Sequence, residues 1–328
     1  DVLKEAKYTP QDEGYTDVKE AVSQMIQQAA AASPGSFTKI DRAAVDRMIA
    51  EIDAKISAQI NEVLHHPEFQ RLESAWRGLE YMVDKIDFTQ NIRLAVLNCT
   101  KNDLLNDFED AGKVDKSNLF RRVYTEGIGT FGGKPYGLVC ANFDFGPAGG
   151  DIDLLRNCAA VSTMAHAPFI ANASPEFFGK GEQSFESLAR LRDMASLFEM
   201  PQYARWRSFR ESEDARNVGL CLPRFMLRQP YAPGDRRVPS FNFTEDTEGQ
   251  HGNYLWGHSS IAFTTRVAAS FAKYRWCPNI IGPNSGGAVE DLPIHQYDAL
   301  GKLQSKMPIE VQISDRRELE LAKSGFIS

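Results

Sequence analysis

The sequence has 328 residues, of which 42% are apolar and 25% are charged, which suits one large or two medium globular domains. Its formal net charge of −7 argues against a general nucleic-acid binder and against a protein that coats anionic membranes. Apolar runs stay well short of the roughly 18 residues that a transmembrane helix needs. The five scattered cysteines include no CxxC pair, which indicates buried thiols in a reducing compartment.

Residues 1–64 have the pattern of a helical N-terminal arm. Residues 16–32 are rich in helix formers and stop at the Ser-Pro-Gly sequence of 33–35. A second helix is predicted from about residue 38 or 41 to Leu64, where the His-Pro sequence ends it. Apolar residues recur along it at three- and four-residue steps and predict one apolar face, formed by Val45, Met48, Ile49, Ile52, Ile56 and Ile60.

A third helix is predicted within residues 65–83, HHPEFQRLESAWRGLEYMV. Pro67 fits the first turn of a helix, where its missing N–H is not needed. The apolar residues predict a wide apolar stripe, and Glu73 and Glu80 are expected on the opposite, solvated face. His65 and His66 are adjacent rather than four residues apart, so they cannot chelate a metal as HExxH does. We interpret this segment as a packing helix.

From residue 92 the pattern changes to strands and helices in alternation. Strands are predicted at 92–98, 136–145, 167–174, 217–228 and 307–314. Helices are predicted at 101–124, 151–166, 184–199 and 253–276, with a short one from Pro201. The strand–helix–strand order within 136–174 predicts parallel strands joined by a right-handed crossover. The expected fold class is mixed α/β: the helical arm at 1–64, then a mixed sheet with flanking helices in 65–328.

Both ends of the sequence suggest a fragment of a longer protein. Residue 1 is Asp rather than Met. A helical pattern near the other end reaches a predicted C-cap at Gly325, and the FIS that follows resembles the first step of a strand. We expect a further C-terminal region in the parent protein.

The turn at 143–151, FDFGPAGGD, is the strongest candidate for a ligand site. Glycines between a strand and a helix can present backbone N–H groups to a phosphate. The spacing is not GxGxxG, however, and Asp144, Asp151 and the nearby Asp153 would repel a phosphate, while the loop has no basic residue. Asp151 is better explained as the N-cap of the following helix. A nucleotide-binding α/β enzyme that uses this turn is therefore retained only as the alternative function.

Other signals of chemistry are weaker. The Gly-Lys pair in 131–137 lacks the spacing of a P-loop, and 282–287 lacks a nucleophile elbow. The six histidines are dispersed, at positions 65, 66, 166, 251, 258 and 295. We expect no catalytic residue, no metal site and no cofactor, and thus a protein that is not an enzyme.

Residues 184–237 hold ten arginines and no lysine. Arg205, Arg207 and Arg210 interleave with Trp206 and Phe209, and the planar guanidinium suits carboxylate pairing and stacking at protein interfaces. We interpret these three arginines as partner-binding residues. Solvated surface charges with local partners, and RNA binding, remain the alternatives.

Four stretches, read in order, resemble the large sheath subunit of the bacterial type VI secretion system, the TssC/VipB family. They are HHPEFQRLESAWRGLEYMV, AHAPFIANASPEFF, LRDMASLFEMPQYARWRSFRESEDARNVGLCLPRFMLRQPY and NYLWGHSSIAFTTRVAASF. The resemblance extends from about residue 60 to about residue 315 and includes GPNSGGAVEDLP. The first sixty residues are similar only in being a helical arm.

The resemblance implies a structural protein of the bacterial cytoplasm that neither binds nucleic acid nor inserts into a membrane. In that family the large subunit pairs with a small sheath subunit, and the heterodimers stack into a helix around an inner tube. The sheath grows from a baseplate and contracts to propel the tube, and a AAA+ unfoldase disassembles the contracted form. The family's C-terminal inner sheath region is expected to be absent here. Residues 1–35 are expected to act as an arm that links neighbouring subunits.

Overall fold

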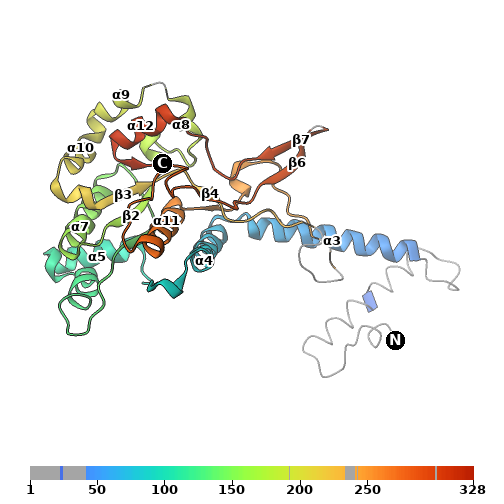
Figure 1. Ribbon diagram of the computed structural model, residues 1–328. Coiled ribbons are helices and arrows are strands. Elements are labelled where there is room, and N and C mark those ends of the chain that lie inside the picture. The colour runs from blue at the N-terminus through green and yellow to red at the C-terminus, as the bar shows by residue number, and fades with distance from the viewer. Residues whose placement is uncertain (1–22, 25–41, 192, 233–240, 242, 300) are drawn as a thin grey trace. The chain divides into compact units, whose positions relative to one another are not determined.

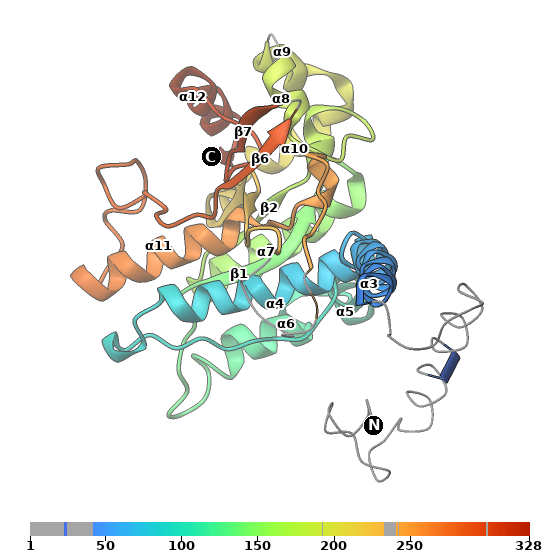
Figure 2. The same ribbon diagram turned by 90° about the vertical axis from the view of Figure 1, so that its right-hand side faces the viewer.

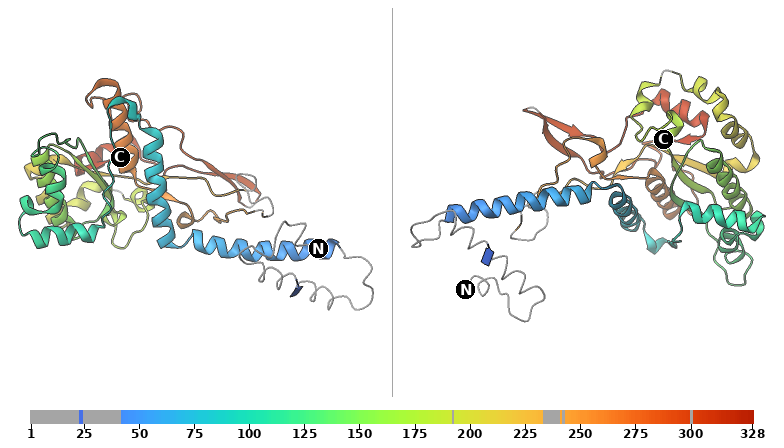
Figure 3. Two further views of the ribbon diagram at one scale, coloured as in Figure 1. Left: turned by 90° about the horizontal axis from the view of Figure 1, so that it is seen from below. Right: turned by 180° about the vertical axis from the view of Figure 1, so that it is seen from behind.

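The computed structural model describes residues 23–24, 42–191, 193–232, 241, 243–299 and 301–328 (Figures 1, 2 and 3). The chain divides into two compact units, residues 1–63 with 231–245 and residues 64–230 with 246–328. Apart from residues 23–24, the predicted helix at 16–32 and the expected arm at 1–35 lie outside the described residues. None of the described helices combines the length and the apolar character that a membrane crossing requires.

The first unit contains most of helix α3 (Arg42–Leu64), which confirms the second predicted helix. Ile49, Ile52 and Ile56 on its apolar face are 44%, 42% and 40% exposed. Within 231–245, the Glu245 N–H donates to the Tyr231 carbonyl (2.8 Å), and the Tyr231 N–H donates to the Glu245 carboxylate (3.0 Å). These two bonds join the first and last residues of the segment 231–245.

The second unit is centred on a parallel four-stranded sheet of order β1-β2-β3-β8. Its strands are β1 (Val139–Phe145), β2 (Phe169–Ala173), β3 (Val218–Cys221) and β8 (Phe326–Ile327). Helix α7 (Gly149–Ala165) connects β1 to β2, and their pairing confirms the predicted parallel arrangement. Helices α7 and α11 (Ser259–Tyr274) cover the two faces of the sheet (Figures 1 and 2).

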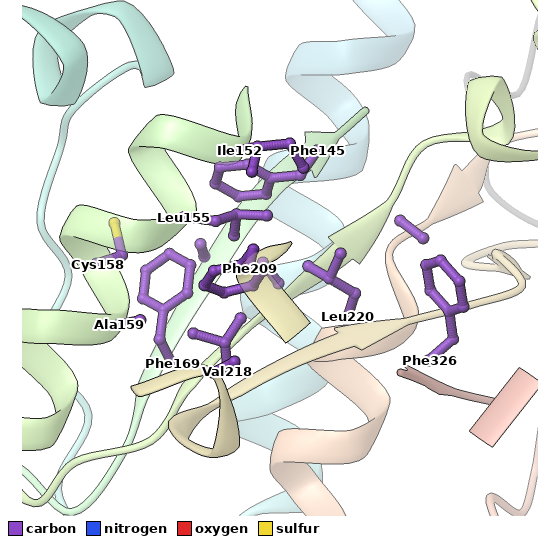
Figure 4. Close-up of a cluster of buried hydrophobic side chains, with 14 of the residues drawn as sticks. Phe145, Ile152, Leu155, Cys158, Ala159, Phe169, Phe209, Val218, Leu220 and Phe326 are labelled. Carbon is purple, nitrogen blue, oxygen red and sulfur yellow. The ribbon is translucent and has the colours of Figure 1, made fainter. Parts of the chain in front are cut away.

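The main core lies between α7 and the sheet. Ile152, Leu155 and Ala159 of α7 are fully buried, and Figure 4 shows them against Phe145 and Phe169 of the strands. Each fully buried aliphatic or aromatic side chain contributes about 1.5–3 kcal/mol to the hydrophobic driving force. The continuous burial of β2 on both faces is the pattern expected of a strand inside a parallel sheet.

Helix α4 (Pro67–Lys85) starts as predicted, with Pro67 in its first turn. His66 is its N-cap, since the Nδ1 atom accepts a hydrogen bond from the Glu68 N–H at 3.3 Å. The helix packs closely on α11 at Gly78, where a Cβ atom would lie 2.5 Å from Cδ1 of Ile261. A second, smaller hydrophobic cluster lies at this contact and consists of the buried side chains of Met82, Ile86 and Ile261.

Two expectations for α4 are wrong. Glu73 is not solvated, because its side chain is only 11% exposed and forms an ion pair with Arg228 at 2.7 Å. The apolar residues are not all packed either: Leu72, Trp76 and Val83 are 56%, 67% and 49% exposed. The sequence pattern identifies an amphipathic helix, but it does not show which apolar residues the chain itself covers.

The helical pattern at 101–124 is divided in the structure. It becomes α5 (Lys101–Ala111), α6 (Asn118–Phe120) and a π-helical turn at Arg121–Thr125. A capping box between Thr100 and Asp103 starts α5, which ends at Gly112 in the left-handed region (φ 64°). Short 3-10 turns at Phe88–Gln90 and Val114–Lys116 lie before and within this region.

The single helix predicted at 184–199 is also wrong. It is divided into α8 (Glu186–Arg190) and α9 (Met194–Glu199), since Leu191 adopts an extended conformation. Helix α10 (Ala204–Arg210) follows a 3-10 turn at Pro201–Tyr203, as predicted. Further 3-10 turns lie at Pro175–Phe178, Glu213–Asn217 and His251–Asn253. Helix α12 (Asp315–Ser324) ends at Gly325 with φ 96°, which confirms the predicted C-cap.

The strand predictions at 92–98 and 307–314 are wrong. Residues 92–98 join no sheet, and the later run makes one isolated bridge, from Ile309 to Phe225. The mostly polar residues before 307 instead form a hairpin of β6 (His295–Ala299) and β7 (Lys302–Lys306), which apolar periodicity could not detect. The run at 217–228 is split at Pro223 into β3 and β4 (Phe225–Met226), and β4 pairs with β5 (Trp256–Gly257).

An aromatic cluster joins β8 to the middle of the chain. The Phe326 ring lies 5.1–5.7 Å from the rings of Phe177, Phe178, Phe198 and Trp206. The indole of Trp206 is nearly parallel to it, with an interplanar angle of 22°. Such ring pairs contribute beyond the burial of their area.

Replacing Phe326 with Ala should lower the free energy of unfolding by about 3–5 kcal/mol, because it leaves a cavity among four aromatic rings. Urea unfolding followed by tryptophan fluorescence measures this difference. Leu319→Ala is the matched control, since Leu319 on α12 is 58% exposed and its truncation should change stability by about 0.5 kcal/mol or less. Equal effects of the two substitutions would contradict the assignment of Phe326 to the core.

Candidate interaction surface

The three arginines predicted to bind a partner lie on α10. Trp206 and Phe209 of the same helix are 2% and 0% exposed and fix its inner face against the core. The structure thus brings Arg205, Arg207 and Arg210 onto one seven-residue helix. Their guanidinium groups nevertheless lie in three different environments.

Arg205 is the most exposed of the three. Its side chain is 65% exposed, and Nη1 lies 3.3 Å from the carboxylate of Asp153, which is 58% exposed. An ion pair this open to water contributes about 0–1 kcal/mol at most. The Arg205 guanidinium is therefore accessible to a carboxylate on another protein.

Arg207 has an internal role. Its Nη1 donates to the carbonyl of Phe198 and, at 3.0 Å, to that of Met200. These carbonyls lie at the C-terminal end of α9, where backbone acceptors lack helical partners and a cation is favoured. Arg207 thus holds the α9 end against α10.

Arg210 is half-buried beside the aromatic cluster. Its Cζ lies 5.8 Å from the centroid of the Trp206 ring, and a Cβ atom at Gly325 would lie 2.6 Å from that carbon. Burial lowers the pKa of the Arg210 guanidinium. Among the described residues, no carboxylate forms an ion pair with it.

The glycine turn at 143–151, which the alternative function would use to bind a phosphate, is bonded to a carboxylate of the chain itself. The Asp151 carboxylate accepts hydrogen bonds from the Gly146 N–H and from Nζ of Lys101, both at 2.6 Å. A Glu176 oxygen would lie 3.3 Å from a Cβ at Gly146, so a second carboxylate borders the turn. The expectation that Asp151 is the N-cap is wrong, because Ala148 is the N-cap and Asp151 folds back onto the turn. This arrangement disfavours a bound phosphate.

The most buried charges lie around Glu310. Its side chain is fully buried, and Arg224 donates to both carboxylate oxygens at 2.8 Å. The Phe185 N–H donates to the same carboxylate at 3.1 Å, and His251 Nε2 lies 2.9 Å away. Burial raises the pKa of the Glu310 carboxyl, but hydrogen bonds from His251 and Arg224 outweigh burial and hold the pKa below its usual value.

A second pair lies at the end of β1. His258 Nε2 is 3.2 Å from the Asp144 carboxylate, and Nδ1 is 2.6 Å from the Asn142 side-chain oxygen. Burial raises the pKa of the Asp144 carboxyl, but the charge of His258 and its hydrogen bond outweigh burial and lower the pKa. Because both ring nitrogens of His258 already face protein oxygens, this pair does not present a free base to a substrate.

Comparison with known proteins identifies the family. Residues 46–328 match the family model described as VipB: EvpB/VC_A0108, tail sheath N-terminal domain. The chain belongs to this family of type VI secretion sheath proteins. It is 42% identical over 288 residues to the type VI secretion system sheath protein TssC1 of Pseudomonas aeruginosa, an alignment that covers 86% of this chain and 57% of that protein. The resemblance drawn from the sequence is confirmed, and the chain spans little more than half the length of that relative.

Sequence reasoning missed the buried ion pairs of this sheath protein. Arg224 and Glu310 are 86 residues apart, and Arg228 and Glu73 are 155 residues apart, so no local pattern joins them. Burial raises the pKa of the Glu73 carboxyl, but hydrogen bonds from Arg228 and Arg77 outweigh burial and lower the pKa. The one available signal was that both arginines flank the apolar strand β4.

The rest of the described chain offers little for ligand chemistry. In the part of the chain that the structure describes, no three His, Cys, Asp or Glu side chains lie close enough together to hold a metal. An open hollow of about 430 Å³ between α5 and α6 is lined by several acidic residues. One of these carboxylates, Asp107, already accepts hydrogen bonds from the N–H groups of Asn118 and Leu119. We therefore assign this hollow a structural role.

Replacing Glu310 with Gln should lower the free energy of unfolding at pH 7 by about 3–5 kcal/mol, because it leaves the buried Arg224 without a counter-charge. A lowered carboxyl pKa contributes stability that is present above its ordinary value of 4.5 and is lost as the pH falls through the lower folded-state value. The difference in free energy of unfolding between wild type and the Glu310→Gln variant should thus shrink below about pH 4.5. Urea unfolding at several pH values measures it, and a difference that grows towards low pH would contradict the assignment.

Proposed function

We propose that this chain is part of the structural large subunit of the type VI secretion contractile sheath. It assembles with a small sheath subunit into a helical tubule around an inner tube and contracts to propel that tube. The match of residues 46–328 to the sheath family carries this proposal. The other proposed partners are neighbouring heterodimers, the baseplate and a AAA+ unfoldase that acts on the contracted sheath, all in the bacterial cytoplasm. Residues 1–64 are proposed as the arm of this assembly.

Exposed apolar side chains in the second unit support an assembly role. Trp76 on α4 is 67% exposed, and Val96 is 69% exposed. Phe131, at the tip of the glycine-rich loop 126–137, is exposed completely. Glycine makes this loop possible, because a Cβ at Gly133 would lie 2.6 Å from the Gly127 carbonyl oxygen. Large apolar groups held in water are typical of surfaces that another protein covers.

The energy for contraction is proposed to reside in the interfaces rather than in a bound nucleotide. Heterologous contacts that do not close into a ring generate a helical filament. Such a filament can occupy two lattices that differ in their contacts, and the difference in free energy drives the change. The Asp151 carboxylate on the glycine turn supports this interpretation, since it already accepts the hydrogen bond of the Gly146 N–H and adds a negative charge to the turn.

Among the three arginines, Arg205 is proposed as the direct contact to a neighbouring subunit. Its exposed guanidinium is accessible, whereas Arg207 caps α9 and Arg210 lies beside Trp206. Arg207 and Arg210 are proposed to hold α10 in position, so that Arg205 faces the neighbouring subunit. A carboxylate on the partner would replace the weak pairing of Arg205 with Asp153.

Electron microscopy of the full-length parent protein, co-expressed with the small sheath subunit candidate encoded beside it, tests the proposed function. Hollow tubules with a cogwheel cross-section are expected, because heterologous contacts generate a helical filament. The parent expressed alone is the control and should form no such tubules. Discrete particles without a co-purifying partner would overturn the proposal.

Reversing the exposed charge with Arg205→Glu should reduce tubule formation and leave stability within about 0.5 kcal/mol of wild type, because this side chain makes one weak ion pair. Negative-stain microscopy counts the tubules, and urea unfolding checks the fold. Arg122→Glu is the matched control, since that arginine is 59% exposed and also makes one surface ion pair. Normal tubules from the Arg205 variant would show that the arginine assignment is wrong.

A further inference from the structure

The second unit is joined to the first by three chain connections: into Leu64, out of Pro230 and back into Asp246. Helix α4 begins at Pro67, just after the first of these connections, and Leu64 itself is buried. The segment that leaves the unit runs from β4 to Pro230, and the segment that returns runs through the 3-10 turn at His251–Asn253 to β5. The bonds that fix these segments decide how a displacement of one connection spreads through the unit.

One side of α4 is polar. Four polar residues recur at steps of three and four, which places them in one stripe along the helix: Gln70, Glu73, Ser74 and Arg77. All four are half-buried. Polar groups that are removed from water need hydrogen-bond partners within the protein. The partners of Gln70, Glu73 and Ser74 lie on the leaving and returning segments.

Glu73 holds the segment that leaves the unit. Its two carboxylate oxygens accept hydrogen bonds from Nε and Nη2 of Arg228, at 2.7 and 3.1 Å. Nε of Arg77 donates to the same carboxylate at 2.9 Å, from within α4. The Glu73 and Arg228 side chains are 11% and 10% exposed, so water and salt screen this bidentate pair little. Because Arg228 lies just before Pro230, the pair fixes the chain close to where it leaves the unit.

Gln70 and Ser74 hold the segment that returns. Nε2 of Gln70 donates to the Gly252 carbonyl, and Oγ of Ser74 donates to the Trp256 carbonyl, both at 2.8 Å. Nε1 of Trp256 donates in turn to the His251 carbonyl at 2.9 Å, which ties the start of β5 to the 3-10 turn before it. The returning segment is therefore bonded to α4 at two points soon after it enters the unit.

The two segments that α4 holds are also bonded to each other. Strands β4 and β5 are antiparallel, with Met226 opposite Trp256, and the Leu227 N–H donates to the Leu255 carbonyl at 3.0 Å. The other edge of β4 is bonded as well, since the Met226 N–H donates to the Pro308 carbonyl at 2.7 Å. A strand bonded at both edges cannot shift alone without losing these hydrogen bonds. A displacement of β4 therefore carries β5 with it.

We propose that α4 is the common anchor of all three connections, so that α4, β4 and β5 respond to a displacement as one body. The helix itself follows the first connection, Glu73 holds the second, and Gln70 and Ser74 hold the third. Such a body transmits a movement at any connection to the second unit, whereas three separate attachments would each loosen alone. Because the coupling lies within this chain, it does not depend on the proposed sheath partners.

Native-state hydrogen exchange on this chain, followed by mass spectrometry at sub-denaturing urea concentrations, measures the opening free energy of each segment. Amides of α4, of 225–228 and of 254–257 should share one opening free energy, lower than that of β2, because they open together. Ser74→Ala removes one bond to the returning segment, yet exchange in the leaving segment 225–228 should rise about threefold or more. Glu73→Gln weakens the pairing with Arg228 in the leaving segment and should likewise raise exchange in 254–257 about threefold or more.

Glu80→Gln is the matched control, since this carboxylate on α4 is 62% exposed and lies 3.4 Å from Nη1 of Arg77. It should leave exchange in both segments within about 1.5-fold of wild type, because exposed ion pairs contribute little. Faster exchange only in the segment that the substituted side chain contacts would show separate attachments and overturn the common anchor. Opening of all these segments together with β2 would also overturn it, because the unit would then open as a whole. If Glu73→Gln fails to fold, wild type and Ser74→Ala still decide between these outcomes.

Discussion

The packing of Phe326 is the interaction on which the arrangement of the second unit depends. Its ring contacts aromatic side chains from the region after β2, from α9 and from α10, and its backbone pairs with β3 as the last strand of the sheet. Through Trp206, this contact sets the position of α10 and the direction in which the exposed Arg205 extends. Gly325 is part of the same arrangement, because the absence of a side chain there lets the Arg210 guanidinium approach the backbone. The proposed partner-binding surface on α10 is thus positioned by the core beneath it.

Much of this fold could be predicted from the sequence, and the failures share one cause. The long apolar helix α11, the crossover from β1 to β2 and the C-cap at Gly325 depend on local patterns, and the structure confirms them. The solvated face expected for Glu73 was wrong because its partner, Arg228, lies 155 residues away. The strand expected at 92–98 was wrong because pairing requires a neighbour, which periodicity does not report. For the candidate surface, the arginine spacing located α10 but could not distinguish the exposed Arg205 from the capping Arg207.

The two edges of the parallel sheet are completed in different ways. At one edge β8 completes the sheet, and the aromatic cluster holds it there. At the other edge, Nζ of Lys101 donates to the Asp144 carbonyl of β1 at 3.0 Å. Edge strands of soluble monomers are ordinarily protected by charge, by proline or by a covering element. The Lys101 ammonium at β1 and the aromatic cluster at β8 are protections of this kind, a charge at one edge and packed side chains at the other.

The late position of Phe326 in the chain also has a kinetic consequence. It follows Trp206 by 120 residues. At the usual elongation rate of about 5–20 residues per second, the ribosome needs roughly 6–24 s to cover that distance. During this interval the rings of Phe177, Phe178 and Trp206 expose to solvent the face that Phe326 later covers. The nascent chain therefore passes through a state with an exposed hydrophobic surface of aromatic rings. In that state, chaperone binding and self-association compete with completion of the sheet.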